Sequence, residues 1–142
     1  MQSQERNPIS AFLEGKVAAG ASSQDIAESV AAAFDALDRA LTPIVGQRGV
    51  AALYERSVHL ARKAHPWLPV PQGSVPSAID LRALVLGLAQ RTAADAGTGG
   101  AALLQTFHDL LTHLIGASLT ERLLRSVWAN FLSGPSAGDT TR

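Results

Sequence analysis

Histidine is the residue of this sequence whose chemistry best suits metal binding or catalysis, because the chain has four histidines and no cysteine. A metal site on a helix needs ligands three or four positions apart, so that they share one face. His108 and His113 are five positions apart, which turns their side chains about 140° away from each other on a helix. His59 and His65 are no better placed, and the paired Glu-x-x-His motif of di-iron bundles is absent. The sequence therefore predicts no metal site and no cofactor.

His108 is the candidate phosphoacceptor. It lies in the sequence Phe-His-Asp-Leu-Leu, on the edge of an apolar helix stripe, while Asp109 and His113 point away from that stripe. The His-Asp-Leu segment resembles the start of the phosphoacceptor helix of histidine kinases, and the resemblance implies a histidine that carries a phosphoryl group. Such a histidine needs an exposed ring and a neighbour that orients it or accepts its proton. The proline that follows in kinase helices and the Lys and Gly of phosphotransfer domains are absent, so the competing interpretation is a surface histidine.

A basic helix face is the candidate partner-binding surface. It consists of Arg48, Arg56, His59, Arg62 and Lys63. Spacings of three and four positions place Arg56, His59 and Lys63 on one side of a helix. This face could dock an acidic protein or a phosphate group, or it could be an ordinary solvated surface. It lacks the interleaved aromatic residues that are typical of nucleic-acid binding, so no nucleic acid is expected.

The composition excludes several classes of protein. A chain of 142 residues that is 46% hydrophobic fits one globular domain. Twelve basic and twelve acidic residues balance, so no long-range field attracts nucleic acid or an anionic membrane. The absence of cysteine removes disulfides and thiolate chemistry. No apolar run is long enough for a membrane span or a signal peptide, and lysine is rare beside arginine. We therefore expect a cytoplasmic protein of a bacterium.

Helices are predicted for nearly the whole first half of the chain, residues 8–65, because apolar residues recur there at steps of three and four. A short helix comes first. A long one follows, capped at its start by Ser22 or Ser23. Gly46 ends that helix in a left-handed conformation, and a third helix runs on to His65, where the next residue, a proline, stops it.

The second half, residues 77–132, shows the same pattern after a proline-rich joint at 66–76. A glycine-rich turn is predicted at 95–100, followed by a helix with a strong apolar stripe that Gly116 ends. The last helix is predicted to begin with a capping box in which Ser118 is the N-cap. Such alternation of helices and short connections predicts helical hairpins.

Two short sequences recur about seventy positions apart. Leu-Thr-Pro-Ile-Val-Gly at 41–46 is matched by Leu-Thr-His-Leu-Ile-Gly at 111–116. Removal of one residue after the glycine also aligns Arg-Ser-Val at 56–58 with the same three residues at 125–127. We interpret the repetition as two related helical hairpins, with chance similarity between amphipathic helices as the alternative.

The predicted fold is all-α: a five- or six-helix up-down bundle whose two hairpin halves could be related by a pseudo-two-fold axis. A polar tail at 134–142 is expected to be flexible. The helix that follows the joint is apolar on more than one face, which is typical of a central helix or of an oligomer interface. The candidate interface residues are Leu81, Leu84, Val85 and Leu88.

No pattern of residues indicates an enzyme. The predicted function is a non-enzymatic regulatory or protein-interaction module in bacterial signalling, with a partner protein or a second copy of the chain, as a homodimer, bound to it. Two alternatives stay open. One is a phosphorelay element that uses His108. The other is a sensor that binds a small apolar ligand between its two halves.

Overall fold

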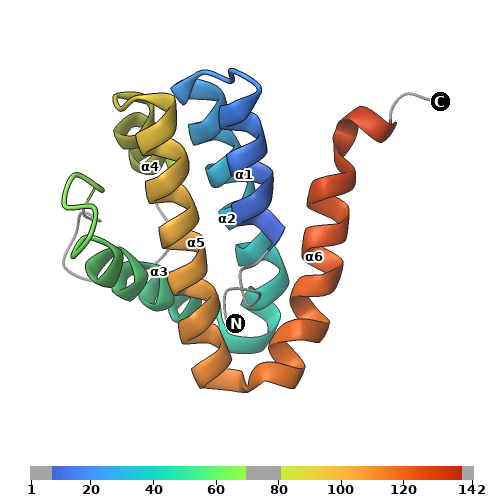
Figure 1. Cartoon of the computed structure of the whole chain (residues 1–142). Coiled ribbons are helices and arrows are strands. Elements are labelled where there is room, and N and C mark those ends of the chain that lie inside the picture. The colour runs from blue at the N-terminus through green and yellow to red at the C-terminus, as the bar shows by residue number, and fades with distance from the viewer. Residues whose placement is uncertain (1–7, 70–80, 139–142) are drawn as a thin grey trace, which may run out of the picture.

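Six helices make up the part of the chain that the structure describes. The computed structural model describes residues 8–69 and 81–138, with side chains described for 11–69 and 81–129. Within these ranges every regular element is a helix (Figure 1). The helices are α1 (Pro8–Ala18), α2 (Ser23–Val45), α3 (Gln47–Ala61), α4 (Leu81–Ala89), α5 (Ala93–Ile115) and α6 (Ala117–Gly138). The prediction of an all-α bundle is confirmed.

The two long helices, α2 and α5, begin in the same way. The side chain of Ser22 accepts a hydrogen bond from the backbone N–H of Asp25 at 3.1 Å, and Thr92 accepts one from Asp95 at 3.0 Å. Each cap satisfies an N–H that has no partner within its helix, and each aspartate carries negative charge in the first turn, where the helix dipole favours it. The two caps lie seventy positions apart, and both helices are 23 residues long.

Glycine ends both long helices and lets the chain turn back. Gly46 has φ 83° and Gly116 has φ 92°, a backbone conformation that side chains with a Cβ rarely adopt. The N–H of Gly46 donates to the carbonyl of Thr42, and that of Gly116 donates to Thr112. The ψ angles are 156° and 153°, so these glycines are not in the left-handed helical region that we predicted for Gly46. The next helix starts one residue later in each case.

The long helices α2 and α5 form the centre of the bundle and run in the same direction. Val30 lies against Gly100, and the ring of Phe34 lies 5.5 Å from that of Phe107, so later positions on one helix meet later positions on the other. The short first helix of each half packs mainly on the long helix of the other half: α1 on α5, and α4 on α2. The long helices also begin at the same end of the bundle in Figure 1. The two halves are therefore interlocked.

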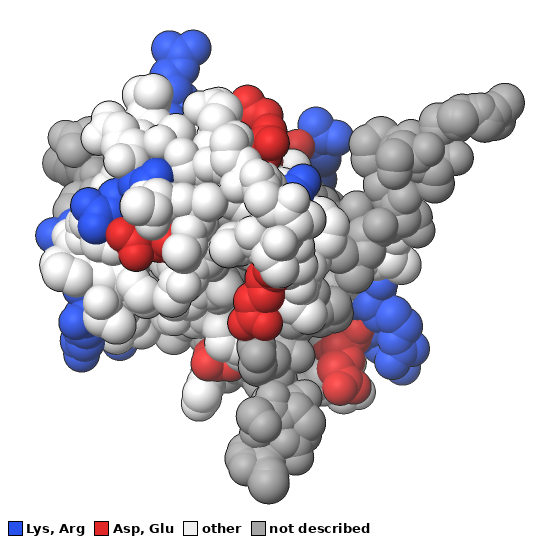
Figure 2. All heavy atoms as spheres, turned by 45° about the horizontal axis from the view of Figure 1, so that its top comes forward, with Lys and Arg blue, Asp and Glu red and all other residues white. Residues whose placement is uncertain are grey.

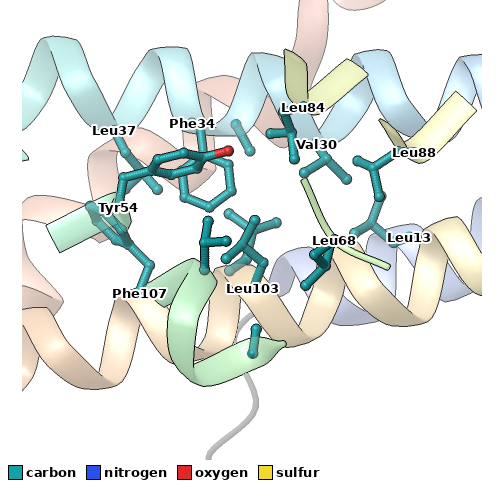
Figure 3. Packing of buried hydrophobic residues seen from close by; sticks show 14 of the residues in the cluster. Leu13, Val30, Phe34, Leu37, Tyr54, Leu68, Leu84, Leu88, Leu103 and Phe107 are labelled. Carbon is teal, nitrogen blue, oxygen red and sulfur yellow. The ribbon is translucent and has the colours of Figure 1, made fainter. Parts of the chain in front are cut away.

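Three aromatic rings occupy the middle of the core. Phe34 meets Tyr54 at 5.2 Å and Phe107 at 5.5 Å between ring centroids, both edge to face, the arrangement that the charge distribution of aromatic rings favours. Aliphatic side chains from α1, α4, α5 and the segment after α3 fill the space beside them (Figure 3). One core thus unites both halves.

The glycine-rich stretch at 95–100 is part of α5, so the predicted turn is wrong. Thr92 caps the helix before this stretch, and the glycines give room to other elements. A Cβ added at Gly97, Gly99 or Gly100 would lie 2.8, 2.5 or 2.6 Å from side-chain atoms of Val17, Trp67 and Val30, respectively. Close packing against α1, α2 and the segment after α3 therefore outweighs the low helix propensity of glycine.

Gly100→Ala should lower the free energy of unfolding by about 1–2 kcal/mol, because the new methyl overlaps Val30 in a buried site. In a Val30→Ala background that overlap is gone, and the same substitution should stabilise the helix by up to about 1 kcal/mol through its propensity. Urea unfolding of the wild type, both single variants and the double variant measures this change of sign. A destabilising effect of equal size in both backgrounds would contradict the proposed contact.

The last helices of the two halves, α3 and α6, bury equivalent positions. Four buried residues of α3 correspond to four buried residues of α6, each pair seventy positions apart: Val50 and Thr120, Tyr54 and Leu124, Ser57 and Val127, Val58 and Trp128. No residue has to be removed to obtain this match. The two Arg-Ser-Val stretches are therefore not equivalent, since Ser57 is buried and Ser126 is exposed. The internal duplication itself stays a prediction.

Helix ends differ from the sequence prediction in three places. α3 ends at Ala61, one turn before the predicted His65. α6 begins at Ala117, so Ser118 is already inside the helix and is not its N-cap. α6 also continues to Gly138, through part of the predicted tail. The joint is described only as far as Pro69, and the start of the second half at 77–80 lies outside the described residues.

Candidate functional site

We give the name cationic face to four exposed residues: Arg48, Arg56 and His59 on the outer face of α3, and Lys63 in the turn directly after the helix. The helix is fixed from behind by its buried stripe, which includes Val50, Tyr54 and Val58. The three positions within α3 fall within an arc of about 80° opposite that stripe. The cationic face is thus held on a rigid support.

The charges of the cationic face are not neutralised by the part of the chain that the structure describes. Elsewhere, Arg39 pairs with Asp35 at 3.1 Å and Arg91 with Asp95 at 3.3 Å. Arg48, Arg56 and Lys63 form no such pair with a described carboxylate. Residues 47–63 hold four basic residues and one acidic residue, a net charge of +3 in a chain whose total charge is zero. The face is therefore a local concentration of positive charge.

Arg62 does not belong to this face, although the sequence placed it there. Its side chain is half-buried, and its guanidinium donates a hydrogen bond to the backbone carbonyl of Leu68. That bond closes the turn after α3 and helps to hold Leu68 in the core, where it is 1% exposed. Arg62 is therefore a structural residue, and we remove it from the candidate binding residues.

His108 lies mainly inside the fold. Its side chain is 25% exposed, and Nδ1 is buried with no hydrogen-bond partner among the described residues. The nearest carboxylate oxygen, Oδ1 of Asp109, is 3.7 Å away, beyond hydrogen-bond distance. Asp109 instead accepts a hydrogen bond from Gln105 at 3.0 Å. Nothing described here orients the ring through Nδ1 or accepts a proton from it, so the geometry offers no support for a phosphoacceptor.

Two residues of the candidate oligomer interface are core residues. Leu84 and Leu88 are both 0% exposed within a single chain. They pack on α2 and the other core elements, and they cannot also meet a second copy while the fold is intact. Leu81 and Val85 are half-buried against the same core. Packing on the core thus explains these four residues, whereas Leu86 on another side of α4 is 57% exposed.

The face that Figure 2 shows has no concentration of one charge among its described residues. Figure 2 presents a face on which basic and acidic side chains are interspersed among wide uncharged areas. Among residues 8–69 and 81–138, no group of three or more acidic or histidine side chains could hold a metal ion. No helix in these ranges combines the length and the apolar character that crossing a membrane requires.

The sequence analysis did not predict the contacts of Trp67 with Gly99 and Arg91. Trp67 follows α3, fills the space left by Gly99 and lies under the guanidinium of Arg91, 4.8 Å from its ring. Proximity of a bulky loop residue and a helical glycine leaves no local trace in the sequence.

Comparisons with known proteins do not bear on these sites. A scan against protein-family models, a search of curated proteins and a search of solved structures each found no match to this chain. The function must therefore be argued from the surface chemistry of the fold itself.

Proposed function

We propose that this chain is a non-enzymatic regulatory module that binds an acidic partner protein through the cationic face of α3. One observation carries the proposal: two arginines on the outer face of α3 and a lysine in the turn after it are exposed and have no described carboxylate partner. Charges of this kind steer an oppositely charged partner and increase its association rate. Their arrangement along α3 and the turn after it suits a partner helix that carries acidic residues on one face.

The expected interaction is weak and transient. An exposed ion pair contributes about 0.2–1 kcal/mol, and salt screens it. The face has no aromatic residue that could act as a buried anchor. Binding should therefore be fast, sensitive to ionic strength and easily reversed, which suits a regulatory contact in signalling. The lack of cysteine and the preference for arginine over lysine support a bacterial cytoplasm as the location.

Arg56→Glu with Lys63→Glu should weaken binding of a synthetic helical peptide that carries glutamates on one face by at least about 10-fold. The loss arises because two attractions become repulsions. Fluorescence anisotropy of the labelled peptide at two salt concentrations measures it. Both side chains are exposed, so the thermal unfolding midpoint should hardly change.

The matched control reverses two charges on α6, the corresponding helix of the second half. Arg122→Glu with Arg125→Glu alters the net charge equally, and both residues are exposed. The proposal requires this control to weaken binding much less than the α3 variant does. Equal losses in both variants would show that only the total charge matters, and the cationic face would then have no special role.

A further inference from the structure

Apolar side chains are exposed at the end of the bundle where the chain turns from α2 into α3 and from α5 into α6 (Figure 1). Both turns lie at this end because the two long helices run in the same direction, and α6 packs on α2 as well as on α5. Among the described residues four large apolar side chains are exposed, and three of them flank these turns: Ile44, Leu114 and Leu119. We call these three residues the turn patch.

The turn patch exists because the core-facing stripe of each long helix runs one turn further than the core. Leu41 in α2 and Leu111 in α5 are both 0% exposed. Three positions later, on the same side of each helix, Ile44 is 46% exposed and Leu114 is 58% exposed. The chain reverses two residues after each of them, and the following helix leads away from this end. The end of the stripe is therefore left without a cover from the part of the chain that the structure describes.

The charges around the turn patch are of both signs. Besides His113, the charged residues within six positions of the two turn glycines are Arg48, Glu121 and Arg122, and all of them are exposed. None of these three forms an ion pair with a described residue. When two copies meet through this end, Glu121 of one copy can approach an arginine of the other. The surface is thus complementary to itself, as an interface with two-fold symmetry requires.

The same charges argue against a membrane as the cover. Surfaces that bind anionic lipid carry clusters of roughly four to eight basic residues. This end of the bundle has two arginines, and Glu121 opposes them. A second copy of the chain is therefore the occupant that both the apolar centre and the mixed charges of the rim fit.

We infer that two copies of this chain associate end to end through the turn patch. Three partly exposed side chains supply only part of the area of about 800 Å² per partner that a stable dimer buries. The contact is therefore weak, with half of the chains paired at a concentration on the order of 0.1–1 mM. Arg56 and Lys63 lie further from the turns, so the dimer presents two cationic faces.

The test is sedimentation equilibrium of the intact chain from about 10 µM to 1 mM, a range that brackets the expected dissociation constant. The average mass should rise from that of one chain toward that of two. Leu114→Glu and Ile44→Glu should each weaken association at least about 10-fold, because the new carboxylate loses water in the apolar contact. Leu86→Glu is the matched control, since Leu86 is 57% exposed on α4 and the same substitution there should leave association unchanged.

Folding and charge are tested by further variants. If circular dichroism shows that Leu114→Glu disturbs the fold, Leu119→Glu on the exposed side of α6 removes the same contact. Glu121→Arg leaves only positive charge at the rim and should weaken association at least about 3-fold.

Three results would overturn the inference. One is a chain that stays monomeric up to 1 mM. Another is association that Leu86→Glu weakens as much as Leu114→Glu does. The third is a monomer that binds phosphatidylserine vesicles and loses this binding in Leu114→Glu, since the turn patch would then contact a membrane.

Discussion

Phe34→Ala should lower the free energy of unfolding by about 3–5 kcal/mol, a large part of the total for a domain of this size. Phe34 is 0% exposed and meets both Tyr54 and Phe107 edge to face, so the truncation leaves a cavity between the two halves. Urea unfolding followed by circular dichroism measures the loss. Leu114→Ala is the control, because Leu114 is 58% exposed and its truncation should cost no more than about 0.5 kcal/mol.

The aromatic contact can be separated from the cavity. Substituting leucine at Phe34, at Phe107 and at both retains most of the apolar volume and removes the ring geometry. The coupling between the two sites should be about 0.5–1.5 kcal/mol. Additive effects of the two substitutions would mean that the rings contribute only by their bulk, and a cost below about 1.5 kcal/mol for Phe34→Ala would mean that the core does not depend on this cluster.

Separating the halves should abolish folding of each half. A fragment of residues 1–69 lacks α5, on which α1 and α3 pack, and a fragment of residues 70–142 lacks α2, on which α4 and α6 pack. Each fragment would expose its apolar stripe to water, and helices that cannot bury their apolar faces are marginal in water. Circular dichroism should show little helix in either fragment and a large gain when equal amounts are mixed.

The mixed fragments should unfold cooperatively, at a midpoint that rises with concentration, because association is then part of folding. A 1–69 fragment that carries Phe34→Ala is the control and should complement its partner less well. A stable, cooperative fold of either fragment by itself would show that the halves are independent units that merely lie together.

Features encoded by neighbouring residues could be predicted from the sequence. The serine before α2, the glycines after α2 and α5, and the apolar stripes depend on contacts within one or two helical turns, and the structure has them at the predicted residues. His65 was predicted as the end of α3 from the proline that follows it, but the turn closed by Arg62 ends the helix earlier.

Features that depend on distant residues could not be predicted in this way. The glycine stretch at 95–100 has the composition of a turn, and only the approach of Val17, Trp67 and Val30 explains why it is helical. Leu84 and Leu88 are buried by their own chain, but the sequence also allowed an oligomer interface. A helix face buried by its own chain and one buried by a second copy show the same apolar pattern.

The candidate sites also differ in whether they depend on neighbouring or on distant residues. The positive charge of α3 is visible in the sequence, since exposure follows from the position of a residue relative to the apolar stripe. The burial of His108 Nδ1 and the bond from Arg62 to Leu68 depend on tertiary packing, and both changed the interpretation of a residue.

The packing of α1 on α5 also limits when the chain can fold during translation. Roughly a hundred residues separate the end of α1 from the end of the helix that covers it, and translation at 5–20 residues per second takes about 5 to 20 s over that distance. During this interval α1 lacks the surface of α5 on which it packs. The nascent chain can therefore complete this fold only after α5 has been synthesised, and its early apolar segments are natural targets for chaperones.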